Sequence, residues 1–415
     1  MRTVVETLRY KPVFLWLAFL VPAASVFGHY LAPNKDILRG HDWGIIAAFA
    51  LAIVVFFSWI PYQSTGRWPT HVFAFFLLTA GAWAYQVVRT QMDGSLFNLT
   101  AFIAPLLLLL LALKRPSKRD LVTALLLLAY SLAVISFLTL SLGTLGLTPS
   151  GFAVSDGGGN RIWMLEQFGL VGRWGGPFGS VNYAAPVGGL ILIVGIASRG
   201  VHRTILLPAG LLILTISQGR TALFAVTAAL LVFFLWSPRF QRLPNHGFIR
   251  ILILALTALG VAGYILSQDP TFNGRTPIWA DFSGLLVSNP IFGVGTTGVI
   301  DFVVENTGQP GFIPHTHAHS VLLDGVTRYG LIFGALTLAI YALALISSAK
   351  ASPENGSGPM ALTVFVIVSG SAETIYSWNY WSIYVAVLTY VVLISACAKR
   401  ETYMPEKDVR SPADT

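Results

Sequence analysis

Three histidines alternate within one short segment, Pro314-His-Thr-His-Ala-His-Ser320, which leads directly into an apolar helical pattern. An imidazole ring accepts a proton near neutral pH and can therefore serve as a general base. We expect His319 to be this base, because it stands at the start of the following helix beside Ser320. Alternating histidines can also share a zinc ion. Against zinc, the chain has no H-E-x-x-H pattern and one cysteine, Cys397.

Two arginines that could bind an anion have no acidic residue close to them in the sequence. Between Glu166 and Asp269 there is no aspartate or glutamate, although Arg173 and Arg220 lie in this interval. Arg220 occupies a tight turn between two apolar segments, Ser217-Gln-Gly-Arg-Thr221. Because an arginine near hydrocarbon is costly, we expect an anionic partner for it. The alternative is that its side chain snorkels to lipid headgroups.

A further arginine, Arg275, precedes a predicted helix in Gly274-Arg-Thr-Pro. A solvated charge is the alternative interpretation of this residue. If guanidinium groups of Arg220 and Arg275 converge at the membrane surface, they would suit a pyrophosphate, because the planar fork of arginine binds phosphate oxygens in pairs. The loops that we predict on the non-cytoplasmic side of a membrane contain no Asp-x-Asp pair that could bind a divalent metal. We therefore predict a site without metal or other cofactor.

Other polar residues keep open roles. Asp301 and Glu305 could orient a histidine or bind a hydroxyl, or they could simply be solvated. Glu373, near Trp378, is either a buried partner for an arginine or a charge at a helix end. The role of His315 is equally open, since a structural function is as compatible with its position as a chemical one.

The elements that must position these residues are membrane helices. The chain of 415 residues is 55% hydrophobic and 11% charged, with a mean hydropathy of +0.70, whereas soluble domains are about a quarter charged. The net charge of +8 resides in basic residues at the ends of apolar segments. This is the pattern that sets membrane topology, so we predict no nucleic-acid partner.

The apolar segments predict an all-α protein with about 12 transmembrane helices in one integral membrane domain, 1–415. The excess of basic residues on one side, such as Arg9, Lys114 and Arg199, places both termini and a tail, 399–415, in the cytoplasm. The predicted spans are 13–32, 44–62, 71–88, 97–113, 121–142, 182–198, 204–218, 221–236, 250–267, 329–348, 359–376 and 382–398.

Two connections on the non-cytoplasmic side are long, 143–181 and 268–328, and loops of this length are often functional. In the second, Thr276 and Pro277 read as the N-cap and first residue of a short amphipathic helix at the membrane interface. Asn289-Pro290 ends this helix, and Gly293, Gly295 and Gly298 predict a flexible stretch after it. No internal repeat is evident, which weakens a transporter interpretation.

In order and topology, four motifs resemble the O-antigen ligase family of integral-membrane glycosyltransferases, which is similar to O-antigen polymerases. Position 320 departs from the family pattern, because asparagine more often follows the histidine there. The motifs are Gly179-Ser-Val-Asn182; Ser217-Gln-Gly-Arg-Thr221; Gly274-Arg-Thr-Pro-Ile-Trp279 continuing to Asn289-Pro-Ile-Phe-Gly-Val-Gly295; and His317-Ala-His-Ser320 followed by Leu322 and Tyr329-Gly-Leu331.

This resemblance implies a GT-C-like enzyme of the bacterial inner membrane with a periplasmic active site. Its donor would be a polysaccharide on undecaprenyl pyrophosphate, and its acceptor a sugar hydroxyl of lipid A–core. His319 would be the general base, and Arg220 and Arg275 would bind the pyrophosphate. His317, Arg173 and Asn182 are further candidates for substrate contacts. A single displacement would invert the anomeric centre.

Two other functions stay open on the sequence. An O-antigen polymerase would use the same donor with a second lipid-linked glycan as acceptor. A transporter or flippase for an anionic lipid would line its path with the same arginines and would form no bond.

Overall fold

The computed structural model describes residues 69–92, 118–144, 174–175, 181–237, 275–309, 315–371 and 383–401, together with the single positions 240, 242, 247 and 249. Within these residues all regular secondary structure is helical. Four predicted spans, 13–32, 44–62, 97–113 and 250–267, lie outside the described residues. Most of the predicted cytoplasmic tail lies outside them as well.

Each predicted span inside the described residues coincides with a helix. These helices are α4 (Thr70–Met92), α6 (Lys118–Thr144), α9 (Val181–Ala197), α10 (Val201–Ser217), α11 (Arg220–Leu235), α16 (Val321–Asn355), α17 (Gly358–Ser371) and α18 (Ile383–Glu401). Two further helices, α14 (Arg275–Ser288) and α15 (Gly295–Asn306), lie in the second long connection.

Three of the described helices are long and apolar enough to cross a membrane, over Thr70–Thr90, Leu121–Ser141 and Val321–Ser352. Shorter apolar helices run over Asn182–Ala197, Val201–Ser217, Arg220–Leu235, Gly358–Ser371 and Val387–Cys397. Large apolar side chains such as Phe73, Leu138 and Phe234 stay exposed on these helices. Contiguous apolar surface of this kind is expected where helices face lipid. The chain therefore has the character of a membrane protein.

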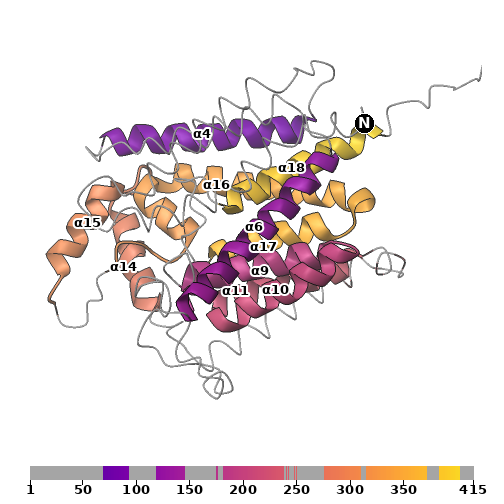
Figure 1. The fold of residues 1–415 in the computed structure, drawn as a ribbon. Coiled ribbons are helices and arrows are strands. Elements are labelled where there is room, and N and C mark those ends of the chain that lie inside the picture. Colours follow the sequence, from indigo (N-terminus) through magenta and orange to yellow (C-terminus); the bar gives the residue numbers. More distant parts are fainter. Residues whose placement is uncertain are drawn as a thin grey trace, which may run out of the picture.

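Glycines let two central helices approach to backbone contact. A Cβ atom at Gly188 of α9 would lie 2.6 Å from the backbone nitrogen of Leu214, and one at Gly210 of α10 would lie 2.4 Å from that of Leu192. Small residues serve this purpose in membrane proteins, where association depends on close packing and not on the hydrophobic effect. The pair α9–α10 is consequently a tight antiparallel hairpin that spans the bundle (Figure 1).

Helix α16 begins earlier than hydropathy predicts. The apolar span is 329–348, but α16 starts at Val321 and is kinked at Gly330, whose φ is 80°. A Cβ atom at Gly330 would lie 1.9 Å from the carbonyl oxygen of Ile291. The kink thus gives the α14–α15 connection room to pass, and the backbone N–H of Leu331 donates to the carbonyl of Pro290 at 2.8 Å. The segment before the kink is more polar, which is why the hydropathy window missed it.

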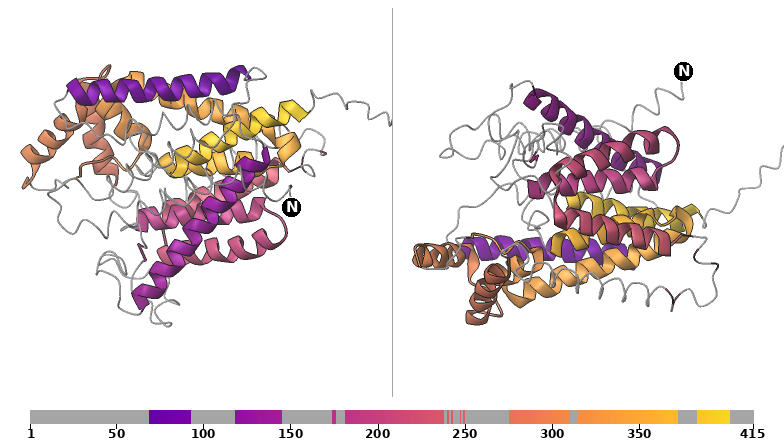
Figure 2. Two further views of the ribbon diagram at one scale, coloured as in Figure 1. Left: turned by 45° about the horizontal axis from the view of Figure 1, so that its top comes forward. Right: turned by 90° about the horizontal axis from the view of Figure 1, so that it is seen from below.

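Helices α14 and α15 lie together at one end of the bundle, beside the beginning of α16, in all three views (Figures 1 and 2). Helix α14 lies where a short helix was predicted, except that it begins at Arg275 and so includes the expected N-cap Thr276. Its apolar residues are not gathered on one face as an amphipathic helix would require. The expected flexible stretch at Gly295 and Gly298 was wrong, because these residues belong to α15. Fully buried Val299 packs with Ile278 of α14, and this packing overrides the low helix propensity of glycine.

Candidate active site at one end of the bundle

The beginnings of four helices gather at one end of the bundle. Helix α9 begins there because it forms a hairpin with α10, and α11 begins there because only a tight turn separates it from the end of α10. Helices α14 and α16 begin at the same end, through contacts described below. Each helix N-terminus carries partial positive charge and unpaired N–H groups, so this end of the bundle favours a bound anion.

The predicted arginine turn is tight, and its backbone is unusual. Helix α10 ends at Ser217, Gln218 takes the left-handed conformation with φ 51°, and α11 begins at Arg220. Arg220 is exposed, whereas Ser217 and Gln218 are buried. The turn therefore presents the guanidinium outward from a rigid, buried base.

Arg275 meets this turn from a distant part of the sequence. Its Nη1 donates to the Oγ1 of Thr221 at 3.3 Å, and Thr221 is the residue next to Arg220. Arg275 is half-buried at the start of α14. The structure thus brings the two arginine motifs together, one at the beginning of α11 and the other at the beginning of α14.

The histidine segment is anchored to α14 by a tryptophan. The indole Nε1 of Trp279 donates to the carbonyl of Ala318 at 2.9 Å, and Ala318 is fully buried against Ile278 and Phe282. Since Arg275 and Trp279 share one helix, α14 connects the histidine segment to the arginine turn. Thr327 of α16 adds a second tie, because its Oγ1 donates to the carbonyl of Phe282 at 3.1 Å.

A carboxylate inside α16 organises the same segment. The Oδ1 of Asp324 accepts from the backbone N–H of Ala318 at 3.1 Å, and its Oδ2 pairs with the Nε of Arg328 at 3.0 Å. Arg328 also donates to the carbonyl of Thr316. Asp324 and Arg328 are each nearly buried, so the two residues fix the backbone on both sides of His317.

Ser320 caps the helix that follows the histidines. Its Oγ accepts from the backbone N–H of Leu323 at 3.3 Å, which is the geometry of an N-cap. This gives the residue a structural role at the one position where the sequence departs from the family pattern. His319 is therefore the last residue before the cap, as the sequence predicts.

The three imidazole rings are close to one another. The ring centroids of His317 and His319 are 4.3 Å apart, and those of His315 and His319 are 5.6 Å apart. Burial lowers the pKa of both His315 and His317, and the neighbouring His319 lowers both further. Asp324 opposes this shift in the pKa of His317. The neutral forms of His315 and His317 are thus favoured near pH 7.

Backbone strain singles out the two halves of this site. Among described residues other than glycine, only Gln218 and His319 have positive φ, at 51° and 49°. A non-glycine residue in this region costs of order 1 kcal/mol or more and persists only where the surroundings hold it, which is common at active sites. One strained residue lies two positions before Arg220, and the other is the predicted base itself.

Metal binding has no support in the described geometry. No group of three or more His, Cys, Asp or Glu residues among those described is arranged to hold a metal ion. Although the three histidines are neighbours, they do not form such a group.

The remaining predicted residues fall in different places. Asn182 is half-buried in the first turn of α9, at the same end of the bundle. Arg173 and Glu373 lie outside the described residues. The neighbouring Trp174 is buried, and its backbone N–H donates to the carbonyl of Ile216 at 3.1 Å. Asp301 and Glu305 are exposed on α15, as solvated charges would be.

Sequence reasoning missed Asp324 and Arg328, which hold the histidine segment. It weighed only Asp301 and Glu305 as acids that could orient a histidine. A signal was present, because an acid four residues before an arginine at the start of a helix predicts an i,i+4 pair. The backbone contacts of this pair with Ala318 and Thr316 left no such signal, since they depend on how the segment folds back over α16.

A comparison with known protein families finds a match for the segment that holds most of these residues. Residues 204–341 match the sequence model of a family described as O-antigen ligase. The match covers about a third of the chain, so this segment is similar to O-antigen ligases. No curated protein matches the chain. The matched segment contains Arg220, Arg275 and all three clustered histidines, whereas Arg173 and Asn182 precede it.

Proposed function

We propose that this chain is an O-antigen ligase, a metal-independent, inverting glycosyltransferase. It transfers a polysaccharide from undecaprenyl pyrophosphate to a sugar hydroxyl of lipid A–core on the periplasmic face of the inner membrane. The observation that carries the proposal is the hydrogen bond from Arg275 to Thr221, beside Arg220, on the helix that also anchors the histidine segment through Trp279.

Similarity to this family supports the class of this reaction, because O-antigen ligases and polymerases are glycosyltransferase-like enzymes of O-antigen assembly. The local chemistry supports the kind of donor. A pyrophosphate is an anion with many acceptor oxygens, and the site offers two guanidinium groups and the N-termini of several helices. The lipid tail of the donor is compatible with the exposed apolar surface of the bundle.

In the proposed reaction, the acceptor hydroxyl oxygen attacks the anomeric carbon of the first sugar of the donor. The new C–O bond forms as the bond from this carbon to the phosphate oxygen breaks, and undecaprenyl pyrophosphate leaves with the electron pair. His319 takes the proton of the hydroxyl. Attack from the face opposite the leaving group inverts the anomeric centre.

The arginines act on the leaving group in this proposal. Negative charge grows on the pyrophosphate as the glycosidic bond breaks, and Arg220 and Arg275 stabilise it. Preorganised charges contribute most when they need not rearrange during reaction. The buried turn under Arg220 and the hydrogen bond of Arg275 to Thr221 supply this preorganisation. His317, Arg173 and Asn182 are proposed as contacts to donor or acceptor.

A reconstituted reaction tests the proposal. The purified chain is incubated with lipid-linked polysaccharide and with lipid A–core, and products are separated by electrophoresis and mass spectrometry. We expect polysaccharide on lipid A–core, unchanged by excess EDTA. Product that appears only as longer lipid-linked chains would instead identify a polymerase, and inhibition by EDTA that zinc reverses would revive the metal site.

The transporter alternative is tested with the chain reconstituted into lipid vesicles. It predicts movement of the lipid-linked substrate across the membrane without bond formation. This movement would survive replacement of His319. Glycan transfer that depends on His319, without such movement, would exclude it.

A further inference from the structure

A pocket lies far from the candidate active site, at the other end of α10. It has a volume of about 800 Å³ and lies between α6, the turn joining α9 to α10, the turn joining α16 to α17, and α18. Helix α10 begins beside this pocket and ends at Ser217 in the arginine turn. A helix of 17 residues is about 26 Å long, close to the thickness of the hydrocarbon core. The pocket therefore lies at the end of the bundle opposite the candidate active site, which would be the other membrane face if α10 spans the hydrocarbon core.

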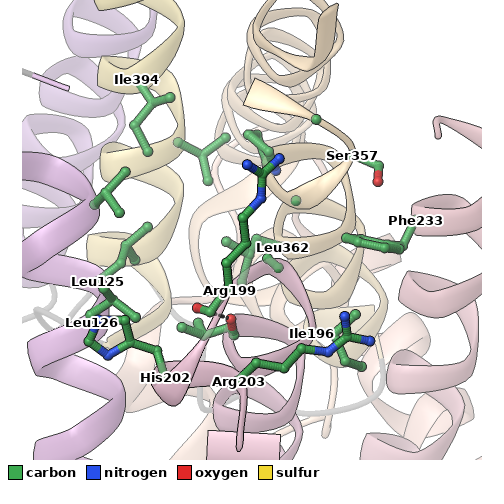
Figure 3. A pocket seen from close by; sticks show the side chains of 18 of the residues that line it. Leu125, Leu126, Ile196, Arg199, His202, Arg203, Phe233, Ser357, Leu362 and Ile394 are labelled. Carbon is green, nitrogen blue, oxygen red and sulfur yellow. Dashed lines mark hydrogen bonds between the residues drawn. The ribbon is translucent and has the colours of Figure 1, made fainter. Parts of the chain in front are cut away.

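The mouth of the pocket is strongly cationic. Lys118, Arg199 and Arg203 line it together with His202, and among the described residues of its lining there is no aspartate or glutamate. Within the described part of the chain, no side-chain hydrogen bond or ion pair occupies Arg199 or Arg203. In Figure 3, Arg199 extends toward the space between Ile394 and Ser357, whereas Arg203 extends on the side of Ile196.

The inner wall of the pocket is apolar. Leu125 and Leu126 come from α6, Val194 from α9, Leu362 from α17 and Ile394 from α18. Most of the surface of these side chains is buried, as for Leu125, Val194, Leu362 and Ile394. A soluble anion would gain nothing from this wall, but a hydrocarbon chain would.

One polar residue at the mouth is held in position. The hydroxyl of Tyr130 and the Nδ1 of His202 form a hydrogen bond of 2.9 Å, and the two rings make an edge-to-face contact. This ties the beginning of α10 to α6 on the side of the pocket near Leu126. The pocket walls are thus preorganised before a ligand enters.

We propose that this pocket binds an anionic glycerophospholipid of the adjacent leaflet, with the phosphate between Arg199 and Arg203 and an acyl chain along the apolar wall. Charge complementarity favours an anionic headgroup, because the described residues of the lining include three basic side chains and no acidic one. Basic pockets between membrane helices bind such headgroups in general. The site is independent of the glycosyl transfer and adds a lipid-binding function to the opposite end of α10.

The test uses the full chain, purified and stripped of lipid in a nonionic detergent. Phosphatidylglycerol, phosphatidylcholine and inorganic phosphate are titrated separately, and binding is followed by thermal unfolding and by native mass spectrometry. We expect phosphatidylglycerol to raise the Tm and to remain bound. The other two probes should do neither.

The decisive variant is Arg199→Gln/Arg203→Gln. Its matched control is Arg242→Gln/Lys350→Gln, which removes two exposed charges at the same end of the bundle and outside the pocket. Charge-assisted hydrogen bonds to phosphate support an expected loss of affinity of about tenfold or more in the first variant. The control should bind phosphatidylglycerol as the native chain does.

A second variant keeps the charges and narrows the pocket beside its apolar wall. Leu126→Trp should weaken retention of phosphatidylglycerol. This variant also tests the proposal if the arginine variant does not fold. Equal retention in the arginine variant and its control would overturn the proposal. An equal rise of the Tm with inorganic phosphate would overturn it as well, because the pocket would then be an anion site without a lipid preference. None of these readouts depends on the glycosyltransferase reaction.

Discussion

Both ends of α10 carry arginines, but the two ends are built differently. At one end Arg220 follows a buried turn, and its neighbour Thr221 accepts a hydrogen bond from Arg275 of another helix. At the other end Arg199 and Arg203 are exposed at the mouth of an apolar pocket. One arginine group is thus part of a connected polar network, and the other is a pair of separate charges over hydrocarbon.

This difference indicates what each end is suited to bind. Hydrogen bonds between helices hold charges in fixed positions, which a reaction requires. Separate charges above an apolar wall can adapt to a headgroup that carries long chains. The close glycine packing of α9 against α10 joins the two ends and keeps them a fixed distance apart.

The largest expected effect is the loss of glycan transfer in His319→Asn. Asparagine tolerates the left-handed backbone of residue 319, so the segment should stay folded while the base is removed. General base catalysis contributes about 10²- to 10⁴-fold, and we expect a loss of that size in the reconstituted transfer assay.

The matched control for this substitution is Thr316→Ala in the same segment. Thr316 is exposed, and its ordered contact is made by the backbone carbonyl, which alanine retains. Full transfer activity in His319→Asn at normal expression would show that the base is a different residue. The contrast between a catalytic end and a lipid-binding end of α10 would then lose its main support.

The second prediction concerns the fork of the arginine side chain. Arg220→Lys and Arg275→Lys keep the charge but lose the paired hydrogen bonds to phosphate. We expect transfer to fall by about ten- to a hundredfold in each, as loss of a charge-assisted hydrogen bond implies. Arg242→Lys, exposed at the opposite end, should leave the rate unchanged. If the lysine variants are fully active, Arg220 contacts lipid headgroups and not the donor.

The third prediction separates steric clash from backbone strain. Gly330 and Gly308 both have positive φ, at 80° and 96°, but only Gly330 would place a Cβ against the backbone of Ile291. Gly330→Ala should therefore destabilise the packing of α14 and α15 on α16 by more than about 2 kcal/mol. Gly308→Ala should cost only the strain of the backbone, about 1 kcal/mol.

Thermal unfolding and the rate of proteolysis in the α14–α15 connection would measure this difference. Because α14 carries both Arg275 and Trp279, the Gly330 variant should also lose transfer activity. Equal stability of the two variants would mean that the kink does not determine where α14 lies.

The smallest expected effect is on the pH dependence of stability. The pKa of His317 is lowered in the folded chain, mainly by burial, so below pH ~6.5 the unfolded chain binds a proton that the folded chain does not. Stability should therefore fall as the pH decreases below this value. His317→Gln should make the decrease of Tm between pH 7.5 and pH 5 shallower. A variant with an unchanged slope would show that His317 titrates alike in both states.

A large part of the fold could be predicted from the sequence, because membrane spans depend on local composition. The boundaries of α9, α10, α11 and α18 agree with the apolar segments to within a few residues. Prediction failed where packing decides. Helix α15 forms from a glycine-rich segment because Val299 is buried in one cluster with residues of α14. The start of α16 after Ser320 agrees with the helix predicted directly after the histidines, although hydropathy alone placed the apolar span at 329–348.

For the candidate site, residue types could be predicted from the sequence, but the contacts between them could not. The absence of acids around Arg220 and the histidines before a helix singled out residues that the structure places at one end of the bundle. The contacts of Asp324 with Ala318 and Arg328 were not predicted, since no periodicity of the sequence encodes a loop folding back over a helix.

The sequence by itself determined that this chain enters a membrane, where its helices lie, and which residues can carry charge or accept a proton. These properties follow from the side chains alone. Only the tertiary structure decided that Arg275 meets Thr221 across 54 positions of sequence, and that residues of α6, α9, α10, α17 and α18 enclose one cationic pocket. Such meetings depend on how helices pack in three dimensions, through glycine contacts and kinks that act between distant segments.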